Sequence, residues 1–374
     1  MINIQKRIEL QEQGKEKIIR NNYSGIFEVC PRFGKTRTVL NSIEEFEGEV
    51  WISSPYADIK KNWIVERSLW KIEKRFTAIC HKSLSTIPKD LDLLVIDEAQ
   101  ALSVNQLKAV NELKPKRVLL LSGYLGDKKR RYINYWLGEP TQIEKYSILQ
   151  GIEDKIISDF SIKVVKISLN SSVRYLKEFG VYATEKEIYD KYTSLFEYYK
   201  SKTTDDFKFN SQKEIFARKR RTHLCSFVSK VEAVKKISRM WDDKKRLIFT
   251  VFNETADILS SHSYHAKSKK FNNLEKFKAG DINEMAVCNM VSMGITFPGL
   301  KHIIIHQIVS NSELNVQKIL RACNLESEDE TAEIVIFCYK NTVEEDWVKE
   351  SLEGIPSEKV VFLSEEEEIR QALK

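Results

Sequence analysis

Two short stretches in the N-terminal part of the chain have the residue types that phosphate chemistry requires. Gly34-Lys35-Thr36 is the core of a phosphate-binding loop, in which backbone N–H groups hold the phosphates, the lysine reaches the β and γ phosphates, and the threonine hydroxyl contacts Mg²⁺. Asp97 and Glu98 follow an apolar run, residues 93–96, that predicts a buried strand. One carboxylate can bind the metal while its neighbour polarises a water, so the two stretches together predict hydrolysis of a nucleoside triphosphate.

The residues around the loop favour this interpretation over a simpler one. Val29 occupies the place where the usual motif begins with glycine, and Gly-Lys-Thr also occurs by chance at the start of an ordinary helix. An apolar strand at residues 26–29 precedes the loop, however, and a helix start at residues 38–43 follows it. Strand, loop and helix are the setting that the motif requires. For Asp97 and Glu98 the alternative is a solvated acidic turn, which the upstream loop disfavours.

Further stretches resemble the motifs of superfamily 2 helicases, in the order that the family has them and along almost the whole chain. They are residues 50–55 (motif Ia), 81–84 (a second backbone-contacting loop), 97–100 (Asp-Glu-Ala-Gln, motif II), 122–124 (motif III), 246–250 (motif IV), 291–298 (motif V) and 317–324 (motif VI). The resemblance implies an α/β fold of two tandem RecA-like lobes with parallel sheets, and an ATP site in the inter-lobe cleft. Strands and helices alternate over residues 25–121, which independently predicts a parallel sheet covered by helices on both faces.

The expected boundary between the two lobes lies near residue 148. Residues 1–147 are expected to form the ATP-binding lobe and residues 148–374 the C-terminal lobe, with a helical segment at about 182–221. No low-complexity linker marks the boundary.

The resemblance also implies which residues bind ATP and Mg²⁺. Lys35 would contact the β and γ phosphates, and Thr36 and Asp97 would hold Mg²⁺. Glu98 would orient the attacking water, Gln100 would sense the γ phosphate, and Arg321, with Gln317 beside it, would reach the nucleotide from the second lobe. Other residues expected at the nucleotide are Arg32, Phe33, Gly34, Arg37 and Gly294. Gln11 and Gln13 are both candidates for reading the adenine edge, and the sequence does not choose between them.

The expected nucleic-acid contacts lie in the loops of motifs Ia, III and V and in the loop at residues 81–84. They are Pro55, Tyr56, Ser83, Ser122, Gly123, Val291, Ser292 and Met293. A bolder hypothesis concerns residues 182–221, which are rich in tyrosine and contain Arg218, Arg220 and Arg221. Aromatic faces can stack on bases and a basic run can follow phosphates, so this segment would contact the nucleic acid. The alternative is an amphipathic helical cover of the second lobe with packed tyrosines and a solvated basic run.

Three positions depart from the family pattern. In motif VI, Leu320 replaces a glycine and Asn324 replaces an arginine, and in motif V, Thr296 replaces an aspartate. An arginine finger contributes on the order of 10³–10⁵ to turnover in related NTPases, so its loss matters. One alternative is therefore a nucleic-acid-binding protein with a degenerate, slow ATPase. Another is the motor of a restriction-type complex, which would need a partner because the chain has no nuclease or methylase motif that we recognise.

Composition adds broad limits. The formal net charge of +6 permits nucleic-acid binding but would not predict it alone. No apolar run approaches the length of a membrane span, and the six cysteines form no Cys-x-x-Cys pair, which argues against zinc and for a reducing cytoplasm. The forms of motifs I and II resemble those of phage and restriction-type DNA helicases, and the compact length resembles phage recombination or branch-migration helicases of the UvsW kind. We therefore expect a monomer that acts on single-stranded, forked or branched DNA rather than RNA, alongside phage replication or recombination proteins.

Overall fold

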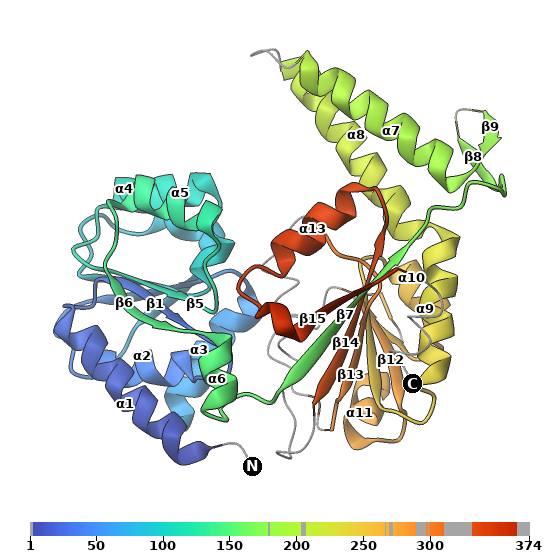
Figure 1. The fold of residues 1–374 in the computed structure, drawn as a ribbon. Helices are drawn as coiled ribbons and strands as arrows, with labels where there is room; N and C mark the ends of the chain where they lie inside the picture. The colour runs from blue at the N-terminus through green and yellow to red at the C-terminus, as the bar shows by residue number, and fades with distance from the viewer. Residues whose placement is uncertain are drawn as a thin grey trace.

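The computed structural model describes residues 3–178, 180–202, 207–265, 267–268, 272–288, 297, 299–309 and 331–364. They form two α/β lobes, each built on a parallel sheet, and a projecting pair of helices (Figure 1). The prediction of an α/β fold with two RecA-like lobes is confirmed. No helix in these ranges is both long enough and apolar enough to cross a membrane.

The first lobe is built on a six-stranded parallel sheet with the order β3-β2-β4-β5-β1-β6. Its strands are β1 (Gly25–Val29), β2 (Val50–Ser54), β3 (Thr77–Cys80), β4 (Leu93–Ile96), β5 (Val118–Ser122) and β6 (Gln142–Tyr146). Its helices are α1 (Ile4–Arg20), α2 (Lys35–Ile43), α3 (Ala57–Leu69), α4 (Val104–Leu113), α5 (Asp127–Leu137) and α6 (Ile148–Glu153), with short 3₁₀ turns at His81–Thr86 and Ala99–Ala101. Helices α1, α2, α3 and α6 cover one face of the sheet, and α4 and α5 cover the other (Figure 1). The central strands β1 and β4 are buried along their whole length, because helices pack on both of their faces.

The second lobe has a seven-stranded parallel sheet with the order β11-β12-β10-β13-β14-β7-β15. Its strands are β7 (Phe160–Ile167), β10 (Arg246–Thr250), β11 (Ser263–Tyr264), β12 (Glu284–Cys288), β13 (His302–Ile305), β14 (Ala332–Tyr339) and β15 (Val360–Leu363). Helices α9 (Val228–Met240) and α10 (Asn253–Leu259) contribute to the core on one face, and α11 (Asn272–Ala279) and α13 (Val343–Ser351) to the core on the other. A 3₁₀ turn at Ser357–Lys359 leads into β15.

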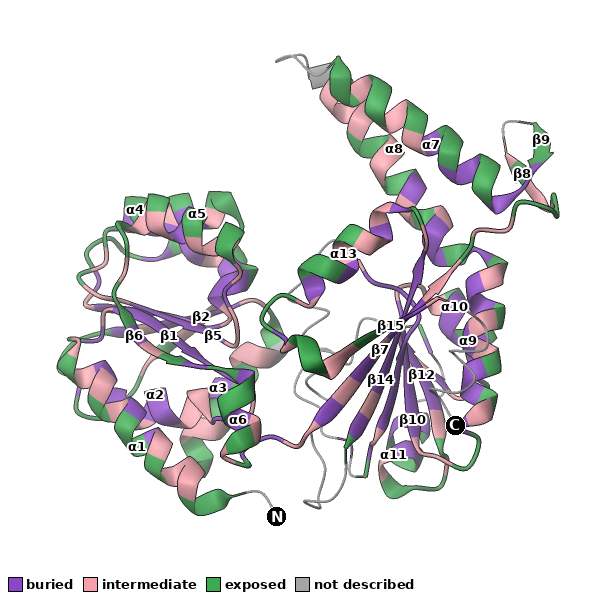
Figure 2. Ribbon diagram, in the orientation of Figure 1, coloured by how far each residue is buried: buried purple, intermediate pink, exposed green. Residues whose placement is uncertain are grey.

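A helical arm, residues 176–226, leaves the second lobe after β7 and returns at α9. It consists of a small antiparallel hairpin, β8 (Leu176–Glu178) and β9 (Val181–Ala183), and two antiparallel helices, α7 (Glu185–Ser201) and α8 (Phe207–Ser226). The helices expected in this segment are present, but they do not lie over the sheet. Figures 1 and 2 show them projecting from the lobe with their outer faces exposed, which differs from the alternative of a helical cover, although its packed tyrosines are found in Tyr189 and Tyr192.

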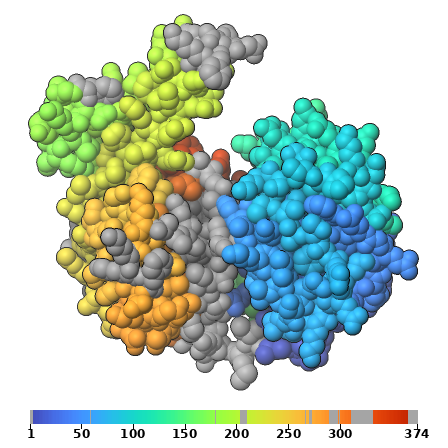
Figure 3. Space-filling view, turned by 180° about the vertical axis from the view of Figure 1, so that it is seen from behind, coloured from blue at the N-terminus to red at the C-terminus, as the bar shows by residue number. Residues whose placement is uncertain are grey.

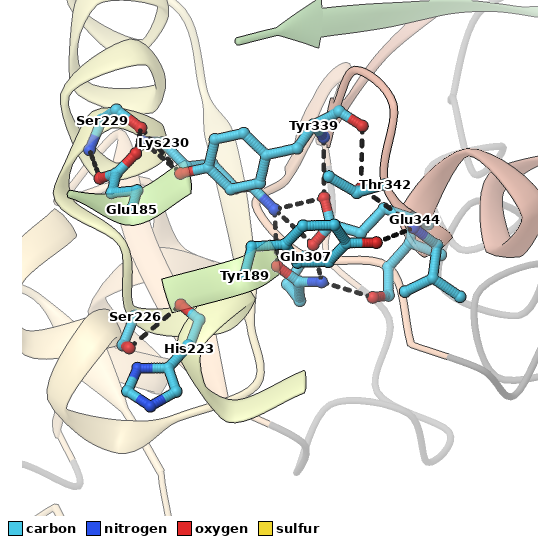
Figure 4. Close-up of polar contacts among 12 residues, drawn as sticks. Glu185, Tyr189, His223, Ser226, Ser229, Lys230, Gln307, Tyr339, Thr342 and Glu344 are labelled. Carbon is cyan, nitrogen blue, oxygen red and sulfur yellow. Dashed lines mark hydrogen bonds and ion pairs between the residues drawn. The ribbon is translucent and has the colours of Figure 1, made fainter. Parts of the chain in front are cut away.

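A buried charged pair lies in the second lobe near the base of the arm (Figure 4). The side chains of Lys230, at the start of α9, and Glu344, at the start of α13, are both 0% exposed. Lys230 Nζ donates to both oxygens of Glu344 at 2.7 Å and to Gln307 Oε1 at 2.7 Å, and it lies 4.4 Å from the ring centre of Tyr339. Glu344 also accepts a bond from the Tyr339 backbone N–H at 2.8 Å. A buried pair of charges is stable only when its remaining hydrogen-bonding groups are satisfied in this way.

Hydrogen bonds connect this pair to the arm. The Tyr339 hydroxyl lies 2.8 Å from the hydroxyl of Ser229, which donates to Glu185 at the start of α7 at 2.5 Å. The hydroxyl of Tyr189, also on α7, accepts from the backbone N–H of Val343 at 2.9 Å. The base of the arm is therefore anchored to the ends of β14 and α13.

We expect Lys230→Met to lower the free energy of unfolding of the second lobe by about 3–5 kcal/mol, because Glu344 would remain buried without its counter-charge. Urea denaturation followed by circular dichroism measures the change. Lys166→Met is the matched control, because Lys166 pairs at 2.8 Å with the next residue, Glu345, with both side chains partly exposed. Its cost should be at most about 1 kcal/mol. Equal costs for the two variants would contradict this account.

Candidate active site

The strand order of the first lobe brings the two predicted motifs together. The loop that contains Gly34 follows β1, and Asp97 and Glu98 follow β4, with β5 between these strands. All three strands run parallel, so their carboxyl ends meet at one edge of the sheet, where open α/β sheets bind ligands. Lys35 Nζ lies 3.4 Å from Glu98 Oε1, with the two side chains 15% and 21% exposed. The pair is therefore open to exchange with a ligand.

The loop makes a close contact with α1 that only glycine allows. Gly34 has φ +98°, and a Cβ atom there would lie 2.1 Å from Nε2 of Gln11. That Nε2 donates to the backbone carbonyl of Phe33 at 2.6 Å. The nitrogen must face this carbonyl, because the amide oxygen of Gln11 can only accept hydrogen bonds. Gln11 is buried, and its Oε1 has no hydrogen-bond partner in the part of the chain that the structure describes. A spare buried acceptor therefore lies beside the loop.

The two glutamine candidates of α1 lie on different sides of that helix. Gln13 is exposed, and two residues of helix separate it from Gln11 by about 200°. Only Gln11 is found at the loop.

Two other residues expected at the nucleotide direct their side chains elsewhere. Phe33 is buried in the core, with its ring centre 5.8 Å from that of Phe27 and 5.4 Å from that of Tyr146. The guanidinium of Arg37 stacks on Trp70 at 4.1 Å. Phe33 can thus contribute only backbone atoms to the site, and the prediction for the Arg37 side chain is wrong in this conformation.

Two further predicted residues lie in or next to the loop. Thr36 is half-buried in the first turn of α2, next to Lys35. Arg32 is half-buried with a φ of 66°, a left-handed conformation that is uncommon for a residue other than glycine.

The acidic pair has two different environments. Asp97 is 5% exposed, and its Oδ2 accepts a bond from the indole nitrogen of Trp63 at 2.8 Å. Its Oδ1 accepts from the backbone N–H of Glu98 at 3.0 Å. Burial, together with the neighbouring carboxylate of Glu98, raises the pKa of Asp97 to about 6. Glu98 is more exposed and has a left-handed backbone, with φ 51°, so its carboxylate faces Lys35.

Motif II contacts motif III through Gln100. Gln100 is buried, and its side-chain nitrogen donates to Glu98, while its Oε1 accepts from the hydroxyl of Ser122 at 2.7 Å. Ser122 is completely buried and was expected at the nucleic acid, so that prediction is wrong for its side chain. A Cβ atom at Gly123 would lie 3.8 Å from Lys35 Nζ, so this half-buried residue borders Lys35.

The same loop contacts the second lobe. The backbone N–H of Tyr124 donates to the Ser122 hydroxyl at 3.1 Å. The ring of Tyr124 covers Gly354, because a Cβ atom built there would lie 2.4 Å from Tyr124 Cε2, and Gly354 has φ +80°. Burial, aided by the nearby carboxylate of Glu353, raises the pKa of Tyr124 to about 12. The edge of the first sheet is thus in direct contact with the turn after α13.

Of the residues expected at the nucleic acid, several stay accessible. Pro55 is half-buried and Tyr56 is 39% exposed where α3 begins, and Ser83 is half-buried.

The three arginines of the arm differ in exposure. Arg218 is exposed and Arg221 is half-buried, but Arg220 is only 8% exposed and stacks on Phe196 at 4.6 Å. Arg220 is a packing residue of the arm, which corrects its prediction as a nucleic-acid contact.

Sequence reasoning missed Trp63 and the burial of His81. Nothing in a lone tryptophan 34 positions before Asp97 indicates the contact. His81 Nδ1 lies 2.8 Å from the hydroxyl of Ser53, and burial lowers the pKa of this histidine to about 4. Some predicted residues lie outside the described residues: Val291, Ser292, Met293, Gly294, Thr296, Gln317, Leu320, Arg321 and Asn324.

Comparison with known proteins gives one family match within the sequence. Residues 208–326 match the family described as Helicase conserved C-terminal domain. No curated protein matches the chain.

Solved structures resemble the chain over nearly all of its length. Dbp5 of S. cerevisiae, bound to RNA and ADP BeF3, is 11% identical with a TM-score of 0.54, covering 97% of this chain and 92% of that one. The Type ISP restriction-modification enzyme LlaBIII bound to DNA is 11% identical with a TM-score of 0.59, and the match covers 97% of this chain but 32% of the enzyme. A fragment of a putative HsdR subunit of a type I restriction enzyme from Vibrio vulnificus YJ016 is 13% identical with a TM-score of 0.54, covering 95% and 68%. At these identities the likeness shows the fold alone, and the family match indicates a helicase C-terminal domain over residues 208–326.

We expect Gly354→Ala to separate the two lobes, because the added methyl group would meet the ring of Tyr124. Small-angle X-ray scattering should then give a larger radius of gyration. Gly280→Ala is the control, since Gly280 has a similar φ of +86° but no atom of the described residues within 4 Å of the added Cβ. Both variants carry the same backbone strain, of about 1–2 kcal/mol. Identical scattering from the two variants would exclude this inter-lobe contact in solution.

Proposed function

We propose that the protein is an ATP-dependent motor of the superfamily 2 kind that moves along or remodels nucleic acid. The observation that supports it most is the Lys35–Glu98 pair at 3.4 Å, in which a phosphate-loop lysine meets the acidic pair at the carboxyl edge of one parallel sheet. The family match over residues 208–326 and the two-lobe fold support the same function. Dbp5 was solved with ADP BeF3, which agrees with nucleotide use in this fold.

The chemistry of the site fits ATP and Mg²⁺. Gln11 Oε1, buried without a partner among the described residues, can accept a hydrogen bond from the amino group of adenine. Thr36 and Asp97 offer a hydroxyl and a carboxylate oxygen, which are ligands that Mg²⁺ takes together with phosphate oxygens. When bound, Mg²⁺ neutralises charge on the β and γ phosphates. Backbone atoms of Arg32, Phe33 and Gly34 would line the phosphates.

The residues of the chain divide the reaction among them. Lys35 exchanges Glu98 for the phosphates, which frees the Glu98 carboxylate to orient the attacking water. Gln100 contacts both Glu98 and Ser122, so a movement of the Glu98 carboxylate shifts the Gln100 side chain. Tyr124, bound to the Ser122 hydroxyl, carries this movement to Gly354 in the second lobe. In this proposal Arg321 and Gln317 complete the site from the second lobe.

A second candidate is a nucleic-acid-binding protein with a slow ATPase. Asn324 stands where the family has an arginine, and Leu320 stands where it has a glycine. Such a protein would bind ATP with little turnover, and Asn324→Arg would raise its rate. Fast hydrolysis stimulated by nucleic acid would exclude this candidate.

For the partner we propose DNA, in single-stranded, forked or branched form. LlaBIII was solved with DNA and Dbp5 with RNA, so these two similar structures do not choose between DNA and RNA. The forms of motifs I and II favour DNA, and a phage recombination role or a restriction-type motor role follows from the same resemblance. Figure 3 shows an open notch between the arm and the first lobe. We also propose that the protein acts as a monomer in the cytoplasm.

We expect Lys35→Ala to abolish tight nucleotide binding and to lower kcat by about 10²–10³-fold, since it removes a preorganised charge at the phosphates. A phosphate-release assay with and without single-stranded DNA, and a fluorescent ATP analogue for affinity, measure these effects. Lys15→Ala is the control, because Lys15 pairs with Glu45 at 2.7 Å on the surface of the same lobe. Activity in Lys35→Ala equal to that of Lys15→Ala would refute the assignment of this loop.

Arg218→Ala combined with Arg221→Ala should weaken DNA binding and lower the salt slope of log K by up to about 2, one for each lost phosphate contact. Fluorescence anisotropy over a salt series, with forked DNA, single-stranded DNA and RNA of equal length, measures both the slope and the preference. Arg174→Ala is the control, since Arg174 is exposed but pairs with Glu187 at the base of the arm. An unchanged slope would remove the arm from the interface, and tighter binding to RNA would overturn the choice of DNA.

A further inference from the structure

Helix α3 contributes a buried hydrogen-bond donor, Trp63, to the acidic pair, and this tryptophan lies outside every predicted motif. We propose that Trp63 is a positioning residue that fixes the carboxylate of Asp97 in the orientation needed to bind Mg²⁺ with nucleotide. This inference rests on the proposed function, because it concerns the same metal site. Trp63 is 1% exposed, and its Nε1 lies 2.8 Å from Asp97 Oδ2.

The two hydrogen bonds of Asp97 fix its carboxylate plane. One comes from the indole of Trp63 to Oδ2, and the other from the backbone N–H of Glu98 to Oδ1 at 3.0 Å. Donors at both oxygens prevent the side chain from rotating about its last bond. Each oxygen still has a second lone pair that can accept a bond from a metal or its water. The carboxylate is therefore held without being saturated.

An indole suits this task better than other donors. It has one N–H and no lone pair available, so it can orient the carboxylate but cannot compete with it for a cation. The ring is itself fixed, because it packs edge-on against Phe76 with ring centres 6.4 Å apart and belongs to the core of the first lobe. The partners that orient metal ligands typically change metal affinity by 10–100-fold when they are replaced.

The position of α3 gives this contact a further consequence. The helix begins at Ala57, directly after Pro55 and Tyr56 of the motif Ia loop. A displacement of that loop would move Trp63 and, with it, Asp97. The contact therefore connects the outer edge of the lobe with the metal-binding carboxylate.

The test compares Trp63→Phe with Trp51→Phe at a fixed pH. Trp51 also donates from its indole to a carboxylate, that of Glu49 at 2.8 Å, but it lies on β2, outside the site. Mg²⁺ is titrated into each protein with a fluorescent ADP analogue. We expect Trp63→Phe to require about 10–100-fold more Mg²⁺ for the same nucleotide binding, with nucleotide affinity in EDTA unchanged. Trp51→Phe should behave as wild type.

A second measurement uses the wild-type protein, so it does not depend on the folding of a variant. The Nε1–H resonance of Trp63, assigned in a ¹⁵N–¹H spectrum by its contacts with Phe76, should shift when Mg²⁺ and ADP are added together, whereas that of Trp51 should not. A wild-type protein that binds Mg²⁺ and ADP without this shift would overturn the inference about Trp63 but not the proposed function. An unchanged Mg²⁺ requirement in Trp63→Phe would do the same. A wild-type protein that binds no Mg²⁺ with ADP would overturn the proposed function and this inference with it.

Discussion

The order of three parallel strands, β4-β5-β1, is the constraint from which the site follows. Because β5 lies between the strands that carry the phosphate loop and the acidic pair, the loop after β5 must pass between the two motifs. That is why Ser122 contacts Gln100 on one side and Gly123 borders Lys35 on the other. A different strand order would leave Lys35 and Glu98 at the same edge of the sheet but would remove the connection from them to the second lobe.

Two lysine–glutamate pairs of the chain differ in burial, and burial decides whether a ligand can reach the lysine. Lys230 and Glu344 are completely enclosed, and groups on Gln307 and Tyr339 satisfy them. Lys35 and Glu98 are partly exposed and farther apart, at 3.4 Å against 2.7 Å. Water or phosphate can therefore reach Lys35 but not Lys230. The same two residue types anchor the arm in one lobe and form a replaceable contact in the other.

The sequence predicts the fold well and brings the two motifs to one edge of the sheet, because strand order and strand ends depend on local signals. Gly34-Lys35-Thr36 and Asp97-Glu98 each follow an apolar strand, and strands that alternate with helices give a parallel sheet. Edge elements were missed: α5 buries only Ile133 fully, and β6 is half exposed, so neither has a strong periodic pattern. Side-chain direction was also beyond the sequence. Ser122 and Arg220 turn inward and Arg37 turns to Trp70, because tertiary neighbours rather than spacing decide where a side chain points.

Few atoms make the contact between the lobes that Tyr124 and Gly354 form. A path of hydrogen bonds runs from Glu98 through Gln100 and Ser122 to the backbone of Tyr124, and it ends on a glycine. Each bond in it has a defined partner, so a change at Glu98 cannot be absorbed by a loose side chain along the way. At the far end, Gly354 lets the tyrosine ring lie flat on the turn after α13. Because the ring fits only against a residue without a side chain, a small rotation of Tyr124 must move the second lobe or break the contact.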